Sequence, residues 1–138
     1  MFYPHLMFLA LLVYSTYISF VDLKIHRITN RSLFFGAITF ACLALIQGEP
    51  LHWRSALVTL TIAPIALTAK VGGGDIKLAI LLSLFFLPST LLFLTQFAIA
   101  FAAISSALVI WSIVKEKSLK SSIALAPAIC GAVIWCAR

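Results

Sequence analysis

The sequence predicts an all-α, polytopic integral membrane protein with about six transmembrane helices and both termini outside. Three observations lead to this fold class. Of the 138 residues, 63% are hydrophobic and only 10% are charged, whereas a soluble domain carries about a quarter charged residues. The apolar residues form runs long enough to span a bilayer, and the basic residues between these runs fall mostly on one side. We therefore expect residues 1–138 to form one transmembrane domain.

The apolar runs are expected to be helices, because a backbone in lipid must satisfy its own hydrogen bonds. The first extends from Phe2 to Val21, and we interpret it as a retained span, since no basic stretch precedes it and no small-residue cleavage site follows. The second and third are predicted over Ser32–Gln47 and Ser55–Ala69. Both are short for a hydrocarbon core of about 30 Å, so flanking basic side chains are expected to reach the headgroups.

The second half of the sequence contains a run of 37 residues without a charge, at positions 78–114. As a single helix this run would be about 55 Å long, which is too long for one crossing. Pro88 supplies a break in it. The sequence therefore predicts a fourth helix over Ile76–Leu87 and a fifth over Ser89–Val114, joined by a tight turn.

The last span is predicted over Ser121–Ala137, with a kink at Pro127. With six spans, the connections after the first, third and fifth lie on one side of the membrane. Eight basic residues fall on that side and two on the other: Lys24, Arg27, Arg31, Lys70, Lys77, Lys115, Lys117 and Lys120 against Arg54 and Arg138. Because an excess of Lys and Arg marks the cytosolic side, both termini are expected outside. The net charge of +6 is then interpreted as a sign of orientation and not of nucleic-acid binding.

Only four acidic residues occur, and two of them adjoin spans at the same predicted cytosolic boundary. Asp22 closes the first span, and Asp75 opens the fourth behind three glycines. A carboxylate at membrane depth costs a few kcal/mol, which makes both aspartates candidate functional residues. The structural alternatives are that Asp22 pairs with Lys24 or Arg27 and that Asp75 caps its helix.

Two carboxylates that meet in a partly desolvated site share one proton, so that one acts as a base and the other as an acid near neutral pH. Such a pair can hydrolyse a peptide with water and needs no metal or other cofactor. Asp22 and Asp75 can meet only if the first and fourth helices pack together. Gly72, Gly73 and Gly74 have no Cβ, so they can adopt positive φ and leave the backbone open to an extended substrate.

The other potential ligands are not expected to form a site. The histidines His5, His26 and His52 do not converge on one side of the membrane, so no metal is expected. His26 is expected to be a solvated loop residue, with tuning of Asp22 as the alternative. The cysteines lie inside apolar runs without a C-x-x-C pair and are interpreted as buried thiols: Cys42, Cys130 and Cys136. Lys77 is expected to bind a lipid headgroup, with a role in keeping the local field positive as the alternative.

The segment GGGDIKL, residues 72–78, resembles the G-x-G-D-x-K-L motif of the type IV prepilin peptidases, the membrane aspartic proteases of the GxGD class. The segment DLKIHRITN, residues 22–30, is similar to their other motif, an aspartate followed by I-P-N. Motif order, spacing and predicted spans also match over essentially the whole chain. The resemblance implies that Asp22 and Asp75 are the catalytic dyad. It also implies that five residues bind substrate or shape the motifs: Gly72, Gly73, Gly74, Lys77 and Asn30.

The resemblance further implies a multi-pass peptidase of the cytoplasmic membrane whose active site faces the cytosol. Its substrate would be a prepilin or pseudopilin of a pilus or protein-secretion system, with a short basic leader and an apolar helix. The cut would lie just before that helix, usually after glycine. The cytosolic C-x-x-C segment of the larger, N-methylating members is missing, so the chain is similar to the short peptidase-only members that serve Flp/Tad-type pili.

Thr29 stands where the family commonly has proline. This departure keeps open a catalytically inactive assembly protein of the pilus machinery. A further alternative is a small ion-coupled transporter, in which the two aspartates bind a cation or relay protons.

Overall fold

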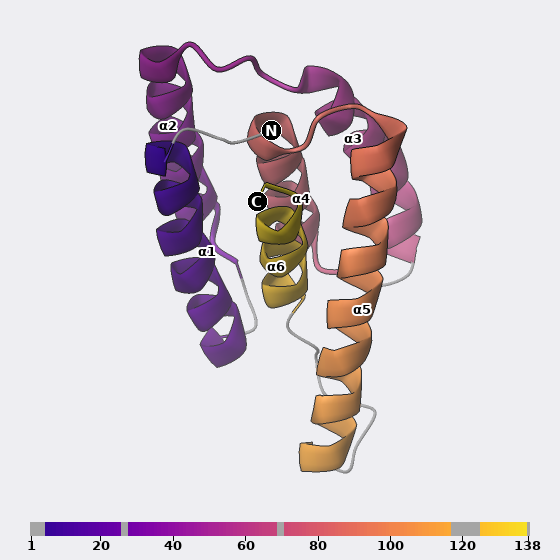
Figure 1. The fold of residues 1–138 in the computed structure, drawn as a ribbon. Coiled ribbons are helices and arrows are strands. Elements are labelled where there is room, and N and C mark those ends of the chain that lie inside the picture. Colours follow the sequence, from indigo (N-terminus) through magenta and orange to yellow (C-terminus); the bar gives the residue numbers. More distant parts are fainter. Residues whose placement is uncertain (1–4, 26–27, 69–70, 117–124, 138) are drawn as a thin grey trace.

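The computed structural model describes residues 5–25, 28–68, 71–116 and 125–137. These residues form six α-helices and no β-strand, which confirms the predicted all-α class: α1 (His5–Ile25), α2 (Asn30–Gln47), α3 (Trp53–Thr68), α4 (Gly73–Phe86), α5 (Leu91–Glu116) and α6 (Ala126–Ala137). Successive helices run in opposite directions (Figure 1). The last residues of α1, α3 and α5 and the first residues of α2, α4 and α6 therefore lie toward one end of the bundle, which we call the basic end.

The helix bounds differ from the predicted runs in ways that matter for function. α1 continues to Ile25, so Asp22 lies inside the helix and does not close it. Helical hydrogen bonds do not require apolar side chains, and the helix therefore outlasts the apolar run. α4 begins at Gly73 and so includes Asp75 in its first turn. Pro127, predicted as a kink, is the second residue of α6, where the missing N–H breaks no intrahelical hydrogen bond.

The long uncharged run is divided as predicted. α4 ends at Phe86 and α5 begins at Leu91, with Pro88 between them. α5 has 26 residues, which gives a length of about 39 Å, and Figure 1 shows it projecting past the other helices at the basic end.

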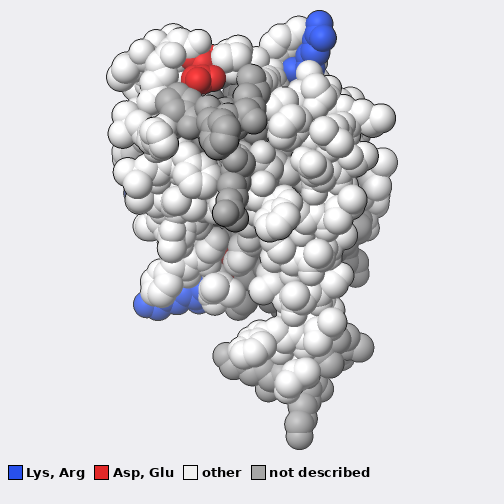
Figure 2. Space-filling view, viewed as in Figure 1, with Lys and Arg blue, Asp and Glu red and all other residues white. Residues whose placement is uncertain are grey.

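The length and apolar composition of the helices indicate a membrane protein. Three of the described helices are long and apolar enough to cross a membrane, at His5–Ile25, Asn30–Gln47 and Leu91–Ser112. α3 and α6 are shorter apolar helices, so a count of six spans stays a prediction. Large apolar side chains such as Leu45, 83% exposed, face outward, which is costly in water but not in lipid. Figure 2 shows a flank almost free of charged side chains, with charges at its two ends.

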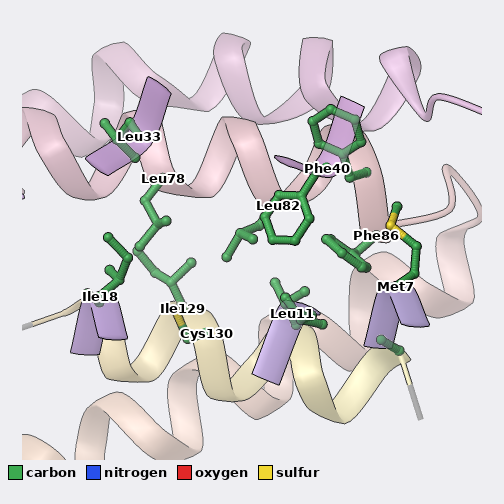
Figure 3. Close-up of a cluster of buried hydrophobic side chains, with 14 of the residues drawn as sticks. Met7, Leu11, Ile18, Leu33, Phe40, Leu78, Leu82, Phe86, Ile129 and Cys130 are labelled. Atoms are coloured by element: carbon green, nitrogen blue, oxygen red, sulfur yellow. The ribbon is translucent and has the colours of Figure 1, made fainter. Parts of the chain in front are cut away.

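The core is built around α4 and α6. α6 packs against α1, α4 and α5, while α4 packs against α2, α3 and α6. Phe40 of α2 lies edge-on to Tyr14 of α1 and to Phe86 of α4, with ring centroids 5.2 and 5.0 Å apart, and Leu11 and Leu82 are fully buried in the same cluster (Figure 3).

The first and fourth helices are connected through other helices. Within the described residues α1 and α4 do not pack on each other; α2 and α6 each pack against both.

Candidate active site

Asp22 is held by the last helix of the chain. Its side chain is 4% exposed, and its Oδ2 accepts a hydrogen bond from the backbone N–H of Ala126 at 3.1 Å. Ala126 is the first residue of α6, where N–H groups lack intrahelical partners and the helix dipole favours a negative charge. Of the pairing partners considered from the sequence, Lys24 places its Nζ 5.9 Å from the ring centroid of Phe20, and Arg27 lies outside the described residues.

Asp75 is much less tightly held. It is half-buried in the first turn of α4, and its Oδ1 is buried without a hydrogen-bond partner in the part of the chain that the structure describes. The N-cap of α4 is Gly72, which has no side-chain cap. The alternative that Asp75 serves as the capping residue is therefore wrong.

The two carboxyl groups lie close enough to act on each other electrostatically. Both also act on the thiol of Cys130, which is one turn beyond Ala126 in α6 and only 2% exposed. Because α6 packs against both α1 and α4, it joins the two aspartates in one site. The structure thus brings together the two candidate acids by a helix that the sequence reasoning had not connected with either.

Sequence reasoning missed two groups of this site, the Ala126 N–H and the Cys130 thiol. Every residue except proline carries a backbone N–H, so the sequence holds no signal for the first. Cys130 was correctly predicted as buried, and nothing in its surroundings along the chain marks it as a neighbour of the aspartates. Cys136 is also buried, but Cys42 is exposed, so the prediction of three buried thiols is wrong for Cys42, which faces outward from α2.

The three glycines before Asp75 provide space and not an unusual backbone. Among the described residues only Gly48 is a glycine with positive φ, at 66°, so positions 72–74 do not use the positive φ that glycine permits. The reason is that this segment begins a helix. Gly72 has φ −60° and ψ 135° as the N-cap, and α4 starts at the next residue.

The three glycines differ in what an added Cβ would meet. A Cβ at Gly72 would lie 2.9 Å from Oδ2 of Asp75, so the missing side chain makes room for the carboxyl group. A Cβ at Gly74 would lie 3.0 Å from Cβ and 3.2 Å from the carbonyl oxygen of Ile28, so this glycine lets α4 approach the residues before α2. A Cβ at Gly73 would meet nothing within 4 Å.

The two sequence motifs are connected directly. Lys77 donates from Nζ to Oδ1 of Asn30 at 3.0 Å, which ties the first turns of α4 and α2 together. This amine, which we expected at a lipid headgroup, is thus engaged within the protein. Thr29, in the place of the family's proline, is the N-cap of α2, and its side chain accepts a hydrogen bond from the N–H of Ser32 at 3.3 Å. Threonine is a favoured N-cap residue, so it has its own structural role.

An apolar groove of about 410 Å³ begins at Asp75. Its lining comes from four helices and from two residues that flank α4, Val71 and Leu87. The helix residues are Val58, Thr59, Ile62, Ala63 and Ala66 of α3, Asp75, Ile76 and Ala79 of α4, Leu94, Phe97, Ala98 and Phe101 of α5, and Ile129 of α6. Along α4 the lining includes Asp75, Ile76 and Ala79, and it includes Leu87 just beyond the end of this helix. α3 and α5 make no packing contact within the described ranges, so the groove lies between helices that are separate. A second hollow, of about 470 Å³ between α1 and α2, includes neither aspartate.

The histidines take no part in this site as far as the structure describes them. His5 begins α1 and His52 directly precedes α3, and both helices begin at the end opposite the aspartates. His26 lies outside the described residues. Within residues 5–25, 28–68, 71–116 and 125–137, no three of His, Cys, Asp and Glu come together as a metal site would require.

Comparison with family models matches most of the chain to a known family. The model of the type IV leader peptidase family matches residues 9–111. This range contains both aspartates, the three glycines, Asn30 and Lys77, whereas α6 lies beyond it. A search of curated proteins and a search of solved structures found no match.

Proposed function

The chain belongs to the type IV leader peptidase family, and on that premise we propose that it is an aspartic endopeptidase of the cytoplasmic membrane. Its substrates are prepilin-like or pseudopilin proteins, from which it removes the leader. Asp22 and Asp75 are the catalytic dyad. The observation that carries this proposal is that the only two acids within the family's motifs interact electrostatically in one partly buried site, although 53 positions separate them in the sequence.

The dyad hydrolyses the peptide bond with a water molecule held between the two carboxyl groups. The ionised carboxylate takes a proton from this water as its oxygen attacks the scissile carbonyl carbon, and the neutral carboxyl donates its proton to the carbonyl oxygen. In the second half of the reaction the amide nitrogen takes a proton from the first carboxyl, the C–N bond breaks, and a gem-diol proton returns to the second. The dyad ends the cycle in its starting state.

The groove beside Asp75 suits the apolar helix of such a substrate. Its lining is apolar apart from Asp75 and Thr59, and it carries four alanines, which let helices approach closely in lipid. With the apolar helix along α4, the bond that precedes the helix reaches Asp75, and the leader extends beyond the basic end of the bundle. Gly72 leaves room for that approach beside the carboxyl group.

The basic end is placed at the cytosolic face in this proposal. Lys24, Arg31 and Lys77 are located in the helix turns at that end, whereas Arg54 begins α3 at the other. By the positive-inside rule the aspartates then face the cytosol and both termini lie outside.

A cleavage assay in membranes tests the dyad. The reporter is a tagged protein with a short basic leader, a glycine and an apolar helix, coexpressed with wild-type protein, Asp22→Asn, Asp75→Asn or the control Glu49→Gln. Wild type and Glu49→Gln should shorten the reporter, while each aspartate variant should lose at least about a hundredfold of the activity, at equal amounts in the membrane fraction. Full processing by either aspartate variant contradicts the proposed dyad. An uncut reporter with wild-type protein would favour the inactive assembly protein.

A further inference from the structure

The proposed dyad is asymmetric, and we infer that α6 makes it so. The backbone N–H of Ala126 holds Asp22 as the ionised member that activates water, and Asp75 is thereby left as the proton donor. Ala126 is a positioning residue in this sense, because it acts through Asp22. The inference rests on the proposed function and assigns the two roles that the dyad mechanism alone leaves undivided.

The first step of the argument is the environment of Asp22. A carboxyl group that is 4% exposed has lost nearly all contact with solvent, and a charge so placed needs a donor. The donor in the structure is the Ala126 N–H at 3.1 Å. A charge-assisted hydrogen bond from the first turn of a helix adds the favourable end of the helix dipole. Both the hydrogen bond and the helix dipole stabilise the ionised form of the Asp22 side chain.

The second step is the environment of Asp75. Its Oδ1 is buried and has no donor among the described residues, and the side chain lines a groove that is otherwise almost wholly apolar. A carboxylate that lacks a donor at a buried oxygen and adjoins apolar surroundings favours its neutral, protonated form. Since the Asp22 charge also acts on this group, ionisation of both members at once is disfavoured. The proton of the dyad therefore resides on Asp75.

The third step concerns the other groups around Asp22. α1 packs against α2 and α6. From α2, Arg31 faces the separate hollow beside Tyr17. From α6, the buried Cys130 thiol lies near both aspartates. On α1 itself, Lys24 lies over Phe20. The hydrogen bond to the Asp22 carboxyl comes from none of these side chains but from the Ala126 N–H.

Ala126→Pro removes this donor selectively. Proline lacks the N–H and is well suited to the first position of a helix, and the Ala126 N–H is not needed inside α6. Because Ala126 is fully buried, a matched control must add similar bulk. Ala126→Val does so and keeps the N–H. We expect Ala126→Pro to lower kcat by about a hundredfold with little change in KM, and to move the acid limb of the pH–rate profile to higher pH. Ala126→Val should leave the acid limb at its wild-type pH, and any fall in its kcat measures the effect of bulk alone.

A second measurement does not depend on peptidase activity. Apolar carbodiimides react with protonated carboxyl groups in membranes, and mass spectrometry of the labelled protein locates the adduct. Wild-type protein and Ala126→Val should be labelled at Asp75 and spared at Asp22, whereas Ala126→Pro should acquire label at Asp22. This readout holds even if the cleavage reporter is wrong, so it separates a failure of this inference from a failure of the proposed function.

Four results would overturn the inference. One is an unchanged kcat and pH profile in Ala126→Pro while Asp22→Asn is inactive. Another is an equal loss in Ala126→Val, which would assign the effect to bulk. The third is preferential carbodiimide labelling of Asp22 in wild-type protein. If Ala126→Pro lowers only the amount of folded protein, with kcat per folded molecule unchanged, the contact is structural and the inference also fails.

Discussion

Asp22 and Asp75 carry the same side chain toward the same end of the bundle, but they differ in burial and in hydrogen bonding. Asp22 lies in the last turns of α1, almost fully buried, with a backbone donor from α6. Asp75 lies in the first turn of α4, half-buried, with an unpartnered oxygen beside an apolar groove. The difference indicates that the Asp22 carboxyl is held in place by the protein, whereas the Asp75 carboxyl is available to a ligand from outside the protein.

The largest effect that distinguishes the two aspartates is expected at Gly72, because a side chain added there would contact Asp75 and not Asp22. We expect Gly72→Ala to reduce reporter cleavage by about a hundredfold, since displacement of a catalytic group by about 1 Å has an effect of that size. The added Cβ would meet Oδ2 of Asp75 at 2.9 Å. Cleavage rate at equal protein amount is the measurement.

The neighbouring glycines are the controls for this prediction. Gly73→Ala should cleave at close to the wild-type rate, because its Cβ would meet nothing within 4 Å. Gly74→Ala should lower the melting temperature, since its Cβ would press on the backbone of Ile28. Equal loss of activity in Gly72→Ala and Gly73→Ala would show that general helix effects, and not room for Asp75, govern the motif.

The next largest effect is expected from filling the groove, which is lined by Asp75 and not by Asp22. Ala98→Phe fills the groove, which Ala98 lines, and should slow cleavage of the helix-containing reporter by about tenfold. A short peptide that covers only the leader junction should be cleaved as before. The matched control is Ala107→Phe, which is also exposed on α5 but two and a half turns away, on the opposite face at about 3.6 residues per turn. Equal effects of the two variants would remove the groove from the substrate path.

The smallest effect distinguishes the two carboxyls by stability. At position 22, Asn can still accept the Ala126 N–H and Ala cannot, so Asp22→Ala should be less stable than Asp22→Asn by about 1–3 kcal/mol. At position 75, Oδ1 has no partner to lose, so Asp75→Ala should be at least as stable as Asp75→Asn. Thermal unfolding in detergent measures both pairs. The same order at both positions would contradict the view that only Asp22 is anchored.

Much of the fold followed from local features of the sequence. Uncharged runs predicted helices, and Pro88 predicted the break before α5. The bounds were less accurate, because α1 continues past its apolar run to Ile25 and α4 begins earlier, at Gly73. Charged residues and glycines at the edge of a span can be part of its helix, although the apolar pattern alone would place them outside it.

What the sequence by itself determined about this protein is its class: a chain so apolar, with its acids so few, has to form helices in lipid and can keep a buried carboxylate only at a cost. Which helices meet was decided only by the tertiary structure. The helices are apolar on nearly every side, so no stripe of residues marks the face that packs, and a backbone N–H leaves no trace in the sequence. The placement of α6 between α1 and α4, with Ala126 against Asp22, therefore arises from packing in three dimensions.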